Sequence, residues 1–212
     1  MKQLEIPFLN SLDERSAIEM VSGALDNLKK HPIDQQPWKE FPYRPKVHFS
    51  IGHSGKCLFL KYFVSESTIR ASYFRPNEDV YKDSCVEFFI ALDGEEDYYN
   101  FEFNVIGTCK LNFGAGRKDR KRISEEAIST IRFSTVIRNV QAGTIQWEIT
   151  LAIPRHAFDE HKFDSFNGKH CRGNFYKCGD ELPRPHFLSW NNVIAPSPDF
   201  HLPQSFGEIH FQ

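Results

Sequence analysis

The chain has 212 residues, with 26 basic and 28 acidic side chains and a formal net charge of −2. This length is sufficient for one domain with its own core, and the balanced charge argues against a dedicated nucleic-acid-binding protein, which usually carries a marked basic excess. Apolar residues make up 40% of the chain, which excludes bulk disorder. The 20 phenylalanines and 7 tyrosines, against 2 methionines, favour β structure because aromatic side chains suit half-buried pleated sheets.

The cysteines and the N-terminus bear on the compartment. The 5 cysteines are odd in number and show no C-x-x-C spacing. This pattern predicts free thiols in a reducing compartment, not a disulfide framework or a zinc knuckle. The first ten residues lack the apolar stretch of a signal peptide, and no long apolar run predicts a membrane span. By sequence the chain is therefore expected to be cytoplasmic, without membrane contact.

A helix is predicted near the N-terminus. Ser11 and Glu14 have the spacing of a capping box, and apolar residues from Ile18 to Leu28 then recur at helical intervals. We predict a helix over residues 12–30, within an N-terminal helical extension (1–32) that packs on the main domain (33–212).

The remainder of the chain alternates with the period of β-strands. Strands are predicted at 46–51, 57–64, 84–92, 98–106, 131–140, 144–151, 173–178, 186–191 and 206–211. A short helix or turn is expected at each of 123–130 and 154–162. Because the strands are short and lack intervening helices, the sequence favours an all-β, antiparallel sandwich or jelly roll.

The strands at 84–92 and 98–106 form a predicted hairpin in which the apolar faces must match. A loop of residues 93–96 places Glu87 opposite Glu102, whereas a loop of residues 94–97 places Glu87 opposite Asn104. In either register two carboxylates gather on the face away from the core.

Adjacent carboxylates are unfavourable unless a cation, a shared proton or a ligand relieves their repulsion. We expect a lysine or arginine beside Glu102, with Lys177 and Arg172 as candidates and a metal ion as the alternative. The other interpretation is a solvated face on which the two charges are screened.

Several segments together resemble the family 9 carbohydrate-binding modules, especially the subgroup common in Bacteroidetes. They are Ile33-Asp34 with Trp38, DSCVEFFI at 83–90, NFEFN at 100–104, RGNFYKCGD at 172–180, HFLSW at 186–190, PDFH at 198–201 and Phe206-Gly207. The resemblance implies a jelly-roll β-sandwich that binds a terminal sugar without catalysis. It also implies a functional link to glycoside hydrolases and polysaccharide catabolism, and in some members export and structural calcium.

The resemblance transfers to the sugar site only in part. In the family, two tryptophans clamp a sugar ring; their positions correspond to Val80, with Tyr81 beside it as a substitute, and to Phe200. The binding glutamate corresponds to Glu87, while an arginine of the next strand is replaced by Glu102. The predicted sugar-binding residues are Tyr81, Glu87, Glu102, Asn104, Asn174, Tyr176, Trp190, Asp199, Phe200 and His201.

Two charged segments have simpler interpretations. Five cations fall within residues 116–122, and an isolated basic run in a neutral protein predicts a solvated loop. Four acidic residues, Asp93, Glu95, Glu96 and Asp97, offer oxygen ligands of the kind that calcium takes, although acidic turns are common without it. No other cofactor is predicted.

Three functions are compatible with these observations. The first is non-catalytic binding of a carbohydrate. The second is a glycoside-processing enzyme in which Glu87 and Glu102 act as an acid/base pair, since opposed strand residues can approach the carboxyl spacing of a retaining glycosidase. The third is a cytosolic interaction protein that has kept the fold and lost the sugar site.

Overall fold

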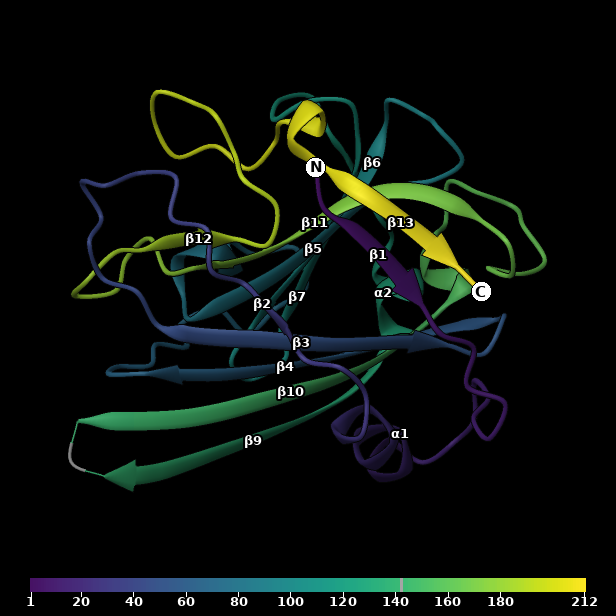
Figure 1. Cartoon of the computed structure of the whole chain (residues 1–212), viewed down its shortest axis with the longest axis horizontal. Helices are drawn as coiled ribbons and strands as arrows, with labels where there is room; N and C mark the ends of the chain where they lie inside the picture. Colours follow the sequence, from purple (N-terminus) through teal and green to yellow (C-terminus); the bar gives the residue numbers. More distant parts are fainter. Residues whose placement is uncertain (142) are drawn as a thin grey trace.

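Two β-sheets packed face to face form the scaffold of the computed structural model, which describes residues 1–141 and 143–212 (Figure 1). The larger sheet has the order β1, β13, β11, β5, β6, β7, β8, with β12 paired to β11. Its strands are β1 (Gln3–Ile6), β5 (Cys85–Ala91), β6 (Tyr98–Asn104), β7 (Cys109–Gly114), β8 (Lys121–Arg122), β11 (His170–Cys178), β12 (Phe187–Ser189) and β13 (Gly207–Phe211).

The smaller sheet has the order β2, β3, β4, β10, β9. Its strands are β2 (His31–Pro32), β3 (Lys46–His53), β4 (Cys57–Glu66), β9 (Arg132–Gln141) and β10 (Thr144–Pro154). Neighbouring strands are antiparallel in both sheets except at the pairing of β1 with β13, which lie side by side in Figure 1. The predicted antiparallel β-sandwich is confirmed.

The interior of the sandwich is dominated by aromatic side chains from both sheets. The ring of Phe49 on β3 stacks on Phe175 of β11 at 3.8 Å between centroids, and Phe175 stacks on Phe88 of β5 at 4.6 Å. Trp147 on β10 is fully buried in the same core. Burial of rings this large contributes much of the hydrophobic stabilisation of the fold.

The N-terminal region contributes strands as well as a helix. Helix α1 spans Ile18–Asp26, which is shorter than the predicted 12–30, and buries Val21 and Leu25 against the outer face of the smaller sheet. The predicted capping box is not formed; instead the backbone N–H of Arg15 donates to Asp13 Oδ1 (2.8 Å), and this turn precedes the helix. None of the helices in the described part of the chain is long and apolar enough to cross a membrane.

All the strands predicted from alternation are present, and the structure adds four that were not predicted: β1, β2, β7 and β8. The predicted short helices correspond to α2 (Glu125–Ser129) and to the 3-10 turn η2 (Arg155–Ala157). Two further 3-10 turns are η1 (Val80–Lys82) and η3 (Pro203–Ser205). Of the added strands, β7 matters most, because it extends the larger sheet beyond the hairpin that carries the two carboxylates.

The outer face of the larger sheet is only partly covered. A second apolar cluster there includes Trp38, Phe89, Tyr176 and Phe200, and it packs under the segments that flank β12. The uncovered remainder of this face, over β5, β6, β7 and β11, is hollowed into a pocket.

Candidate functional site

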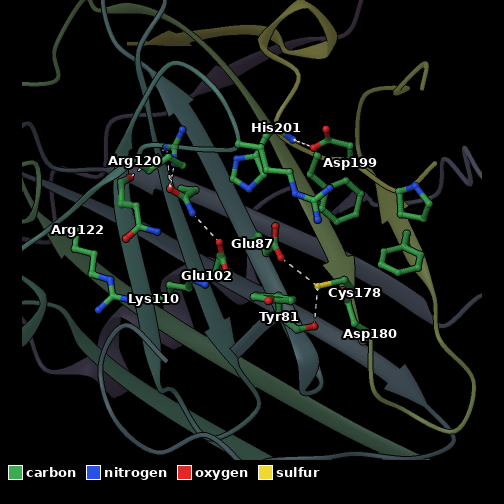
Figure 2. Close-up of a pocket in the computed structure, with 16 residues that line it drawn as sticks. Tyr81, Glu87, Glu102, Lys110, Arg120, Arg122, Cys178, Asp180, Asp199 and His201 are labelled. Carbon is green, nitrogen blue, oxygen red and sulfur yellow. Dashed lines mark hydrogen bonds between the residues drawn. The ribbon is translucent and has the colours of Figure 1, made fainter. Parts of the chain in front are cut away.

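The pocket on the outer face of the larger sheet has a volume of about 360 Å³, within the range of small-molecule sites. Strands β5, β6, β7 and β11 form its floor, and its walls include residues of the turn at Tyr81 and of the segments 117–120 and 198–201 (Figure 2). Its lining residues are Tyr81, Glu87, Asn100, Glu102, Lys110, Asn112, Arg117, Arg120, Arg122, Cys178, Asp180, Phe187, Pro198, Asp199, Phe200 and His201.

Two glutamates stand side by side at the floor. The β5–β6 pairing places Glu87 directly opposite Glu102, as the 93–96 loop register predicts. Each side chain is only 3% exposed. Cys178 Sγ donates to Glu87 Oε1 (3.1 Å), and Asn100 Nδ2 donates to Glu102 Oε1 (2.6 Å). Glu102 Oε2, in contrast, is buried without a hydrogen-bond partner in the described chain.

Burial changes the protonation of this pair. Burial, followed by repulsion from Glu102, raises the pKa of Glu87 well above its usual range. Burial also raises the pKa of Glu102 to about 7, although Lys110 and the hydrogen bond from Asn100 oppose the shift. Because loss of the second proton would place two charges at one buried point, Glu87 is a neutral carboxylic acid at physiological pH.

The cation beside Glu102 is Lys110, not Lys177 or Arg172. Lys110 lies on β7 as the cross-strand partner of Glu102, with its Nζ 2.9 Å from Asp79 Oδ1. Arg172 instead donates to the backbone oxygen of Glu95 (3.1 Å), away from the floor. The alternation of Cys109, Leu111 and Phe113 is a signal that could have identified β7 and therefore Lys110.

Lys177 faces the interior of the sandwich, where it belongs to a separate buried network. Its Nζ lies 3.1 Å from Glu66 Oε2 and 2.8 Å from His186 Nε2. Trp147 Nε1 donates to the other oxygen of Glu66 (2.7 Å). Burial and the charge of Lys177 lower the pKa of His186 to about 3, so its ring is neutral and Nε2 accepts from the ammonium group.

The basic segment 116–122 was expected to be a solvated loop, and this expectation is wrong for part of it. Arg120 returns to the pocket edge and donates to Asn100 Oδ1 through Nε (3.0 Å) and Nη2 (2.8 Å). Its Nη2 also donates to the backbone carbonyl oxygen of Tyr98 (2.6 Å), and its guanidinium lies 4.1 Å from the centre of the Tyr98 ring. Arg120 thus fixes the Asn100 amide that donates to Glu102. Local charge counting cannot reveal a loop that folds back in this way.

Two other arginines of that segment, Arg117 and Arg122, line the pocket with exposed side chains. Across residues 1–141 and 143–212, neither side chain has an ion-pair partner. They leave positive charge at the edge of the pocket.

The opposite wall is aromatic. Phe200 stacks on Tyr176 at 4.1 Å between centroids, and Tyr176 Oη donates to the Phe200 oxygen (3.2 Å). The next residue, His201, pairs through Nδ1 with Tyr98 Oη (2.8 Å). Burial and the nearby arginines lower the pKa of His201 to about 3, so the ring is neutral. Asp199 accepts from the His201 backbone N–H (2.9 Å) and completes this wall.

Of the predicted sugar-binding residues, six line the pocket: Tyr81, Glu87, Glu102, Asp199, Phe200 and His201. Val80, at the position of the family's first tryptophan, is buried in the cluster beneath, while its neighbour Tyr81 is half-buried and lines the pocket. An aromatic side chain is therefore retained near each tryptophan position.

The structure places the other four predicted residues outside the pocket lining. Asn104 Nδ2 donates to Asp83 Oδ2 (3.0 Å), and Asn174 Oδ1 accepts from the Asn191 backbone N–H (2.8 Å). Tyr176 lies beneath Phe200, and Trp190 lies in the sandwich core. Face alternation alone could not separate these supporting residues from the lining, because the loops that cover the face decide which positions stay open.

The acidic turn at 93–97 has partners of another kind. Asp93 pairs with Lys169, and Glu95 Oε2 lies 2.8 Å from His161 Nε2. Within the described chain, this turn does not bring three metal-type ligands together; the one such group is Cys85, Glu87 and Cys178. Calcium binding at this turn stays a prediction.

Comparison with known proteins agrees with this geometry. The family model for carbohydrate-binding family 9 matches residues 19–211, and the chain belongs to that family. A search of curated proteins found no match.

Solved structures show the same fold. A proposed carbohydrate-binding protein from Bacteroides uniformis ATCC 8492 is 36% identical, with a TM-score of 0.93, and the match covers 100% of this chain and 99% of that one. A family 9 module from Caldicellulosiruptor kristjanssonii in complex with cellotriose is 13% identical, with a TM-score of 0.61 and coverage of 100% and 94%. A family 9 module from Caldicellulosiruptor kristjanssonii in complex with glucose is also 13% identical, with a TM-score of 0.60, and the match covers 100% of this chain and 96% of that one. At 13% identity the likeness concerns the fold alone.

Proposed function

We propose that the pocket binds a terminal sugar unit of an oligo- or polysaccharide and performs no chemistry on it. The observation that carries this proposal is Glu102 Oε2, a buried oxygen without a partner at the floor of an open pocket. A buried acceptor that lacks a partner costs about 1–3 kcal/mol, and a sugar hydroxyl would remove this cost by donating to it.

The walls of the pocket offer contacts for the parts of a sugar that do not reach Glu102. Tyr81 and Phe200 offer ring faces for the apolar C–H patches of a pyranose, while Asn112 and the arginines offer polar contacts. Family membership and the sugar complexes of the Caldicellulosiruptor kristjanssonii module support a carbohydrate as the ligand.

The carboxylate pair is poorly arranged for glycoside hydrolysis. A glycosidase needs its two carboxyl groups on either side of the scissile bond. Glu87 and Glu102 instead project from opposed positions of the same sheet into one floor, so both would approach a bound ring from the same side. This arrangement supports binding without catalysis.

Calorimetry with neutral and acidic mono- and oligosaccharides tests the proposal. Replacing Glu102 with Gln should weaken sugar binding about 10-fold or more, because a charge-assisted hydrogen bond contributes about 1.5–3 kcal/mol. Tyr81→Ala should weaken it several-fold by removing a ring face. Glu126→Gln, on an exposed position of α2, and Tyr43→Ala, on a half-buried tyrosine away from the pocket, are the matched controls.

The proposal fails if a broad glycan panel gives no binding, or if binding survives in the Glu102→Gln and Tyr81→Ala double variant. Turnover of aryl glycosides that is lost in Glu87→Gln would instead indicate an enzyme.

A further inference from the structure

Three potential metal ligands converge beneath the pocket, where β5 and β11 pair. Cys85 and Cys178 are directly opposed in the two strands, and Glu87 follows Cys85 by two residues on the same face. One ligand atom from each of the three residues lies within 4.8 Å of the other two. Nothing in carbohydrate binding requires two thiols beside a carboxyl group.

The separations are close to those of a metal site. With Zn–S bonds of about 2.3 Å and Zn–O bonds of about 2.0 Å, the ligands of a tetrahedral zinc ion lie roughly 3.5–3.8 Å apart. Cys178 Sγ and Glu87 Oε1 are 3.1 Å apart, and the third ligand is within 4.8 Å, so side-chain adjustments of about 1 Å would close the site. All three residues lie on well-paired strands, which hold their backbones in place.

We propose that Cys85, Cys178 and Glu87 form a site for a thiolate-preferring divalent cation, with Zn²⁺ as the natural occupant. Thiolates select zinc over hard cations such as calcium, which takes oxygen ligands. Cys178 and Glu87 line the pocket, as Figure 2 shows, whereas Cys85 is fully buried and does not line it. The fourth position of a tetrahedral ion therefore faces the pocket, where water or a ligand hydroxyl can occupy it.

The charge balance of the loaded site is acceptable. Binding replaces one proton on each thiol and the proton on Glu87, and these protons pass to solvent. Two thiolates, one carboxylate and a divalent cation carry a net charge of −1. Lys110, which also pairs with Asp79, and Arg120 line the same pocket and oppose that charge, and the balance requires Glu102, opposite Glu87, to keep its proton.

This site does not depend on sugar binding. Buried cysteines often serve only as small apolar side chains, as Cys57 and Cys171 do in this chain. What distinguishes Cys85 and Cys178 is that both converge on a carboxyl group at an open cavity. If the protein binds both a sugar and the metal ion, the open coordination position of the ion would face the bound sugar.

Metal titration of the reduced, chelator-stripped full chain tests the site. Zn²⁺ should bind with a stoichiometry of one in competition with a chromophoric chelator, and Cd²⁺ should produce a thiolate-to-metal charge-transfer band in the ultraviolet. Cys85→Ser and Cys178→Ser should each weaken Zn²⁺ binding more than about 100-fold, because loss of a direct ligand exceeds the loss expected for an outer-shell partner. Glu87→Gln should weaken it and leave the Cd²⁺ band in place.

Cys171→Ser is the matched control, since it alters another buried cysteine of β11 outside the cluster. It should bind Zn²⁺ like the unaltered chain, and circular dichroism should show that every variant is folded. Cys→Ala replacements at positions 85 and 178 serve if the serine variants unfold. Absence of the Cd²⁺ band, unchanged Zn²⁺ binding in the double cysteine variant, or a Cys85–Cys178 disulfide in place of two free thiols would overturn the proposal.

Discussion

The interior of the sandwich and the pocket face of the larger sheet each bury a carboxylate, and the two side chains have different surroundings. Glu66, in the interior, has Lys177 at 3.1 Å from one oxygen and the Trp147 indole at 2.7 Å from the other. Glu102, on the pocket face, receives a hydrogen bond from Asn100 at one oxygen, and its other oxygen has no partner in the described chain.

The two carboxylates therefore differ in function: the fold itself supplies the partner of Glu66, whereas Glu102 can still accept a hydrogen bond from a ligand. Glu66 Oε1 accepts from the Trp147 indole, and Glu66 Oε2, although it forms no hydrogen bond in the described chain, has the Lys177 ammonium 3.1 Å away, so the fold itself supplies the charge that compensates Glu66. Glu102 keeps an acceptor free at an open cavity and shares that floor with Glu87. Unsatisfied buried groups cost stability, and they are found where a ligand, a proton or an ion completes them.

Removal of the interior cation should have the largest effect on stability. Lys177→Met leaves Glu66 as an uncompensated buried charge, and we expect a loss of about 3–5 kcal/mol in the free energy of unfolding by urea denaturation. Lys2→Met breaks the half-exposed pair with Asp34 and is the control, with an expected loss below about 1 kcal/mol. A loss below 1 kcal/mol for Lys177→Met would show that the interior network is not a stabilising element.

The carboxyl group of Glu102 in the pocket should instead make the stability of the protein depend on pH. In the unfolded chain Glu102 titrates near 4.5, whereas burial raises its pKa in the folded chain to about 7. Between these values the folded state holds a proton that the unfolded state has lost. The contribution of Glu102 to stability is therefore fully present below pH 4.5 and is lost as the pH rises through 7.

Urea unfolding of metal-free protein at several pH values measures this effect. Relative to Glu102→Gln, the unaltered chain should lose about 3 kcal/mol of stability between pH 4.5 and pH 8, since each pKa unit corresponds to about 1.4 kcal/mol. A constant difference across this range would mean that Glu102 is solvated. An excess of zinc should change the profile if Glu87 is a metal ligand.

The β-sandwich could be predicted from the sequence because its strands show a local alternation of apolar and polar residues. The apolar rows of β5, β6 and β10 fix the faces of the strands and leave two possible registers for the hairpin, one of which is the observed pairing of Glu87 with Glu102. The helix limits were wrong because the Ser11–Glu14 pattern forms no cap. The capping motif is local, but whether it is used depends on where the chain must turn to reach the sheet.

The charged residues that act on the pocket floor were harder to predict from the sequence than the strands. Lys110 and Arg120 reach the floor through β7 and through a loop that folds back on the sheet, and both were absent from the predicted site. Phe200 and Tyr81 line the pocket, and the sequence could place them there because aromatic residues remain beside the family's tryptophan positions. Asn104 and Asn174 were assigned to the site because their faces are correct, but the tertiary packing of the surrounding loops covers them.

The smallest predicted effect concerns how Lys110 divides its charge between Asp79 and Glu102. Lys110 Nζ lies 2.9 Å from Asp79 Oδ1, and its charge is the main opposing influence on the pKa of Glu102. Lys110→Met should therefore raise the pKa of Glu102 further, by roughly one unit. Asp79→Asn removes a competitor for the ammonium group and should lower the pKa of Glu102 by less than this. An NMR titration of the glutamate side-chain carboxyl carbons in metal-free protein measures both shifts. Opposite signs for the two variants would support control of the pocket-floor protonation by Lys110, whereas shifts of the same sign would contradict it.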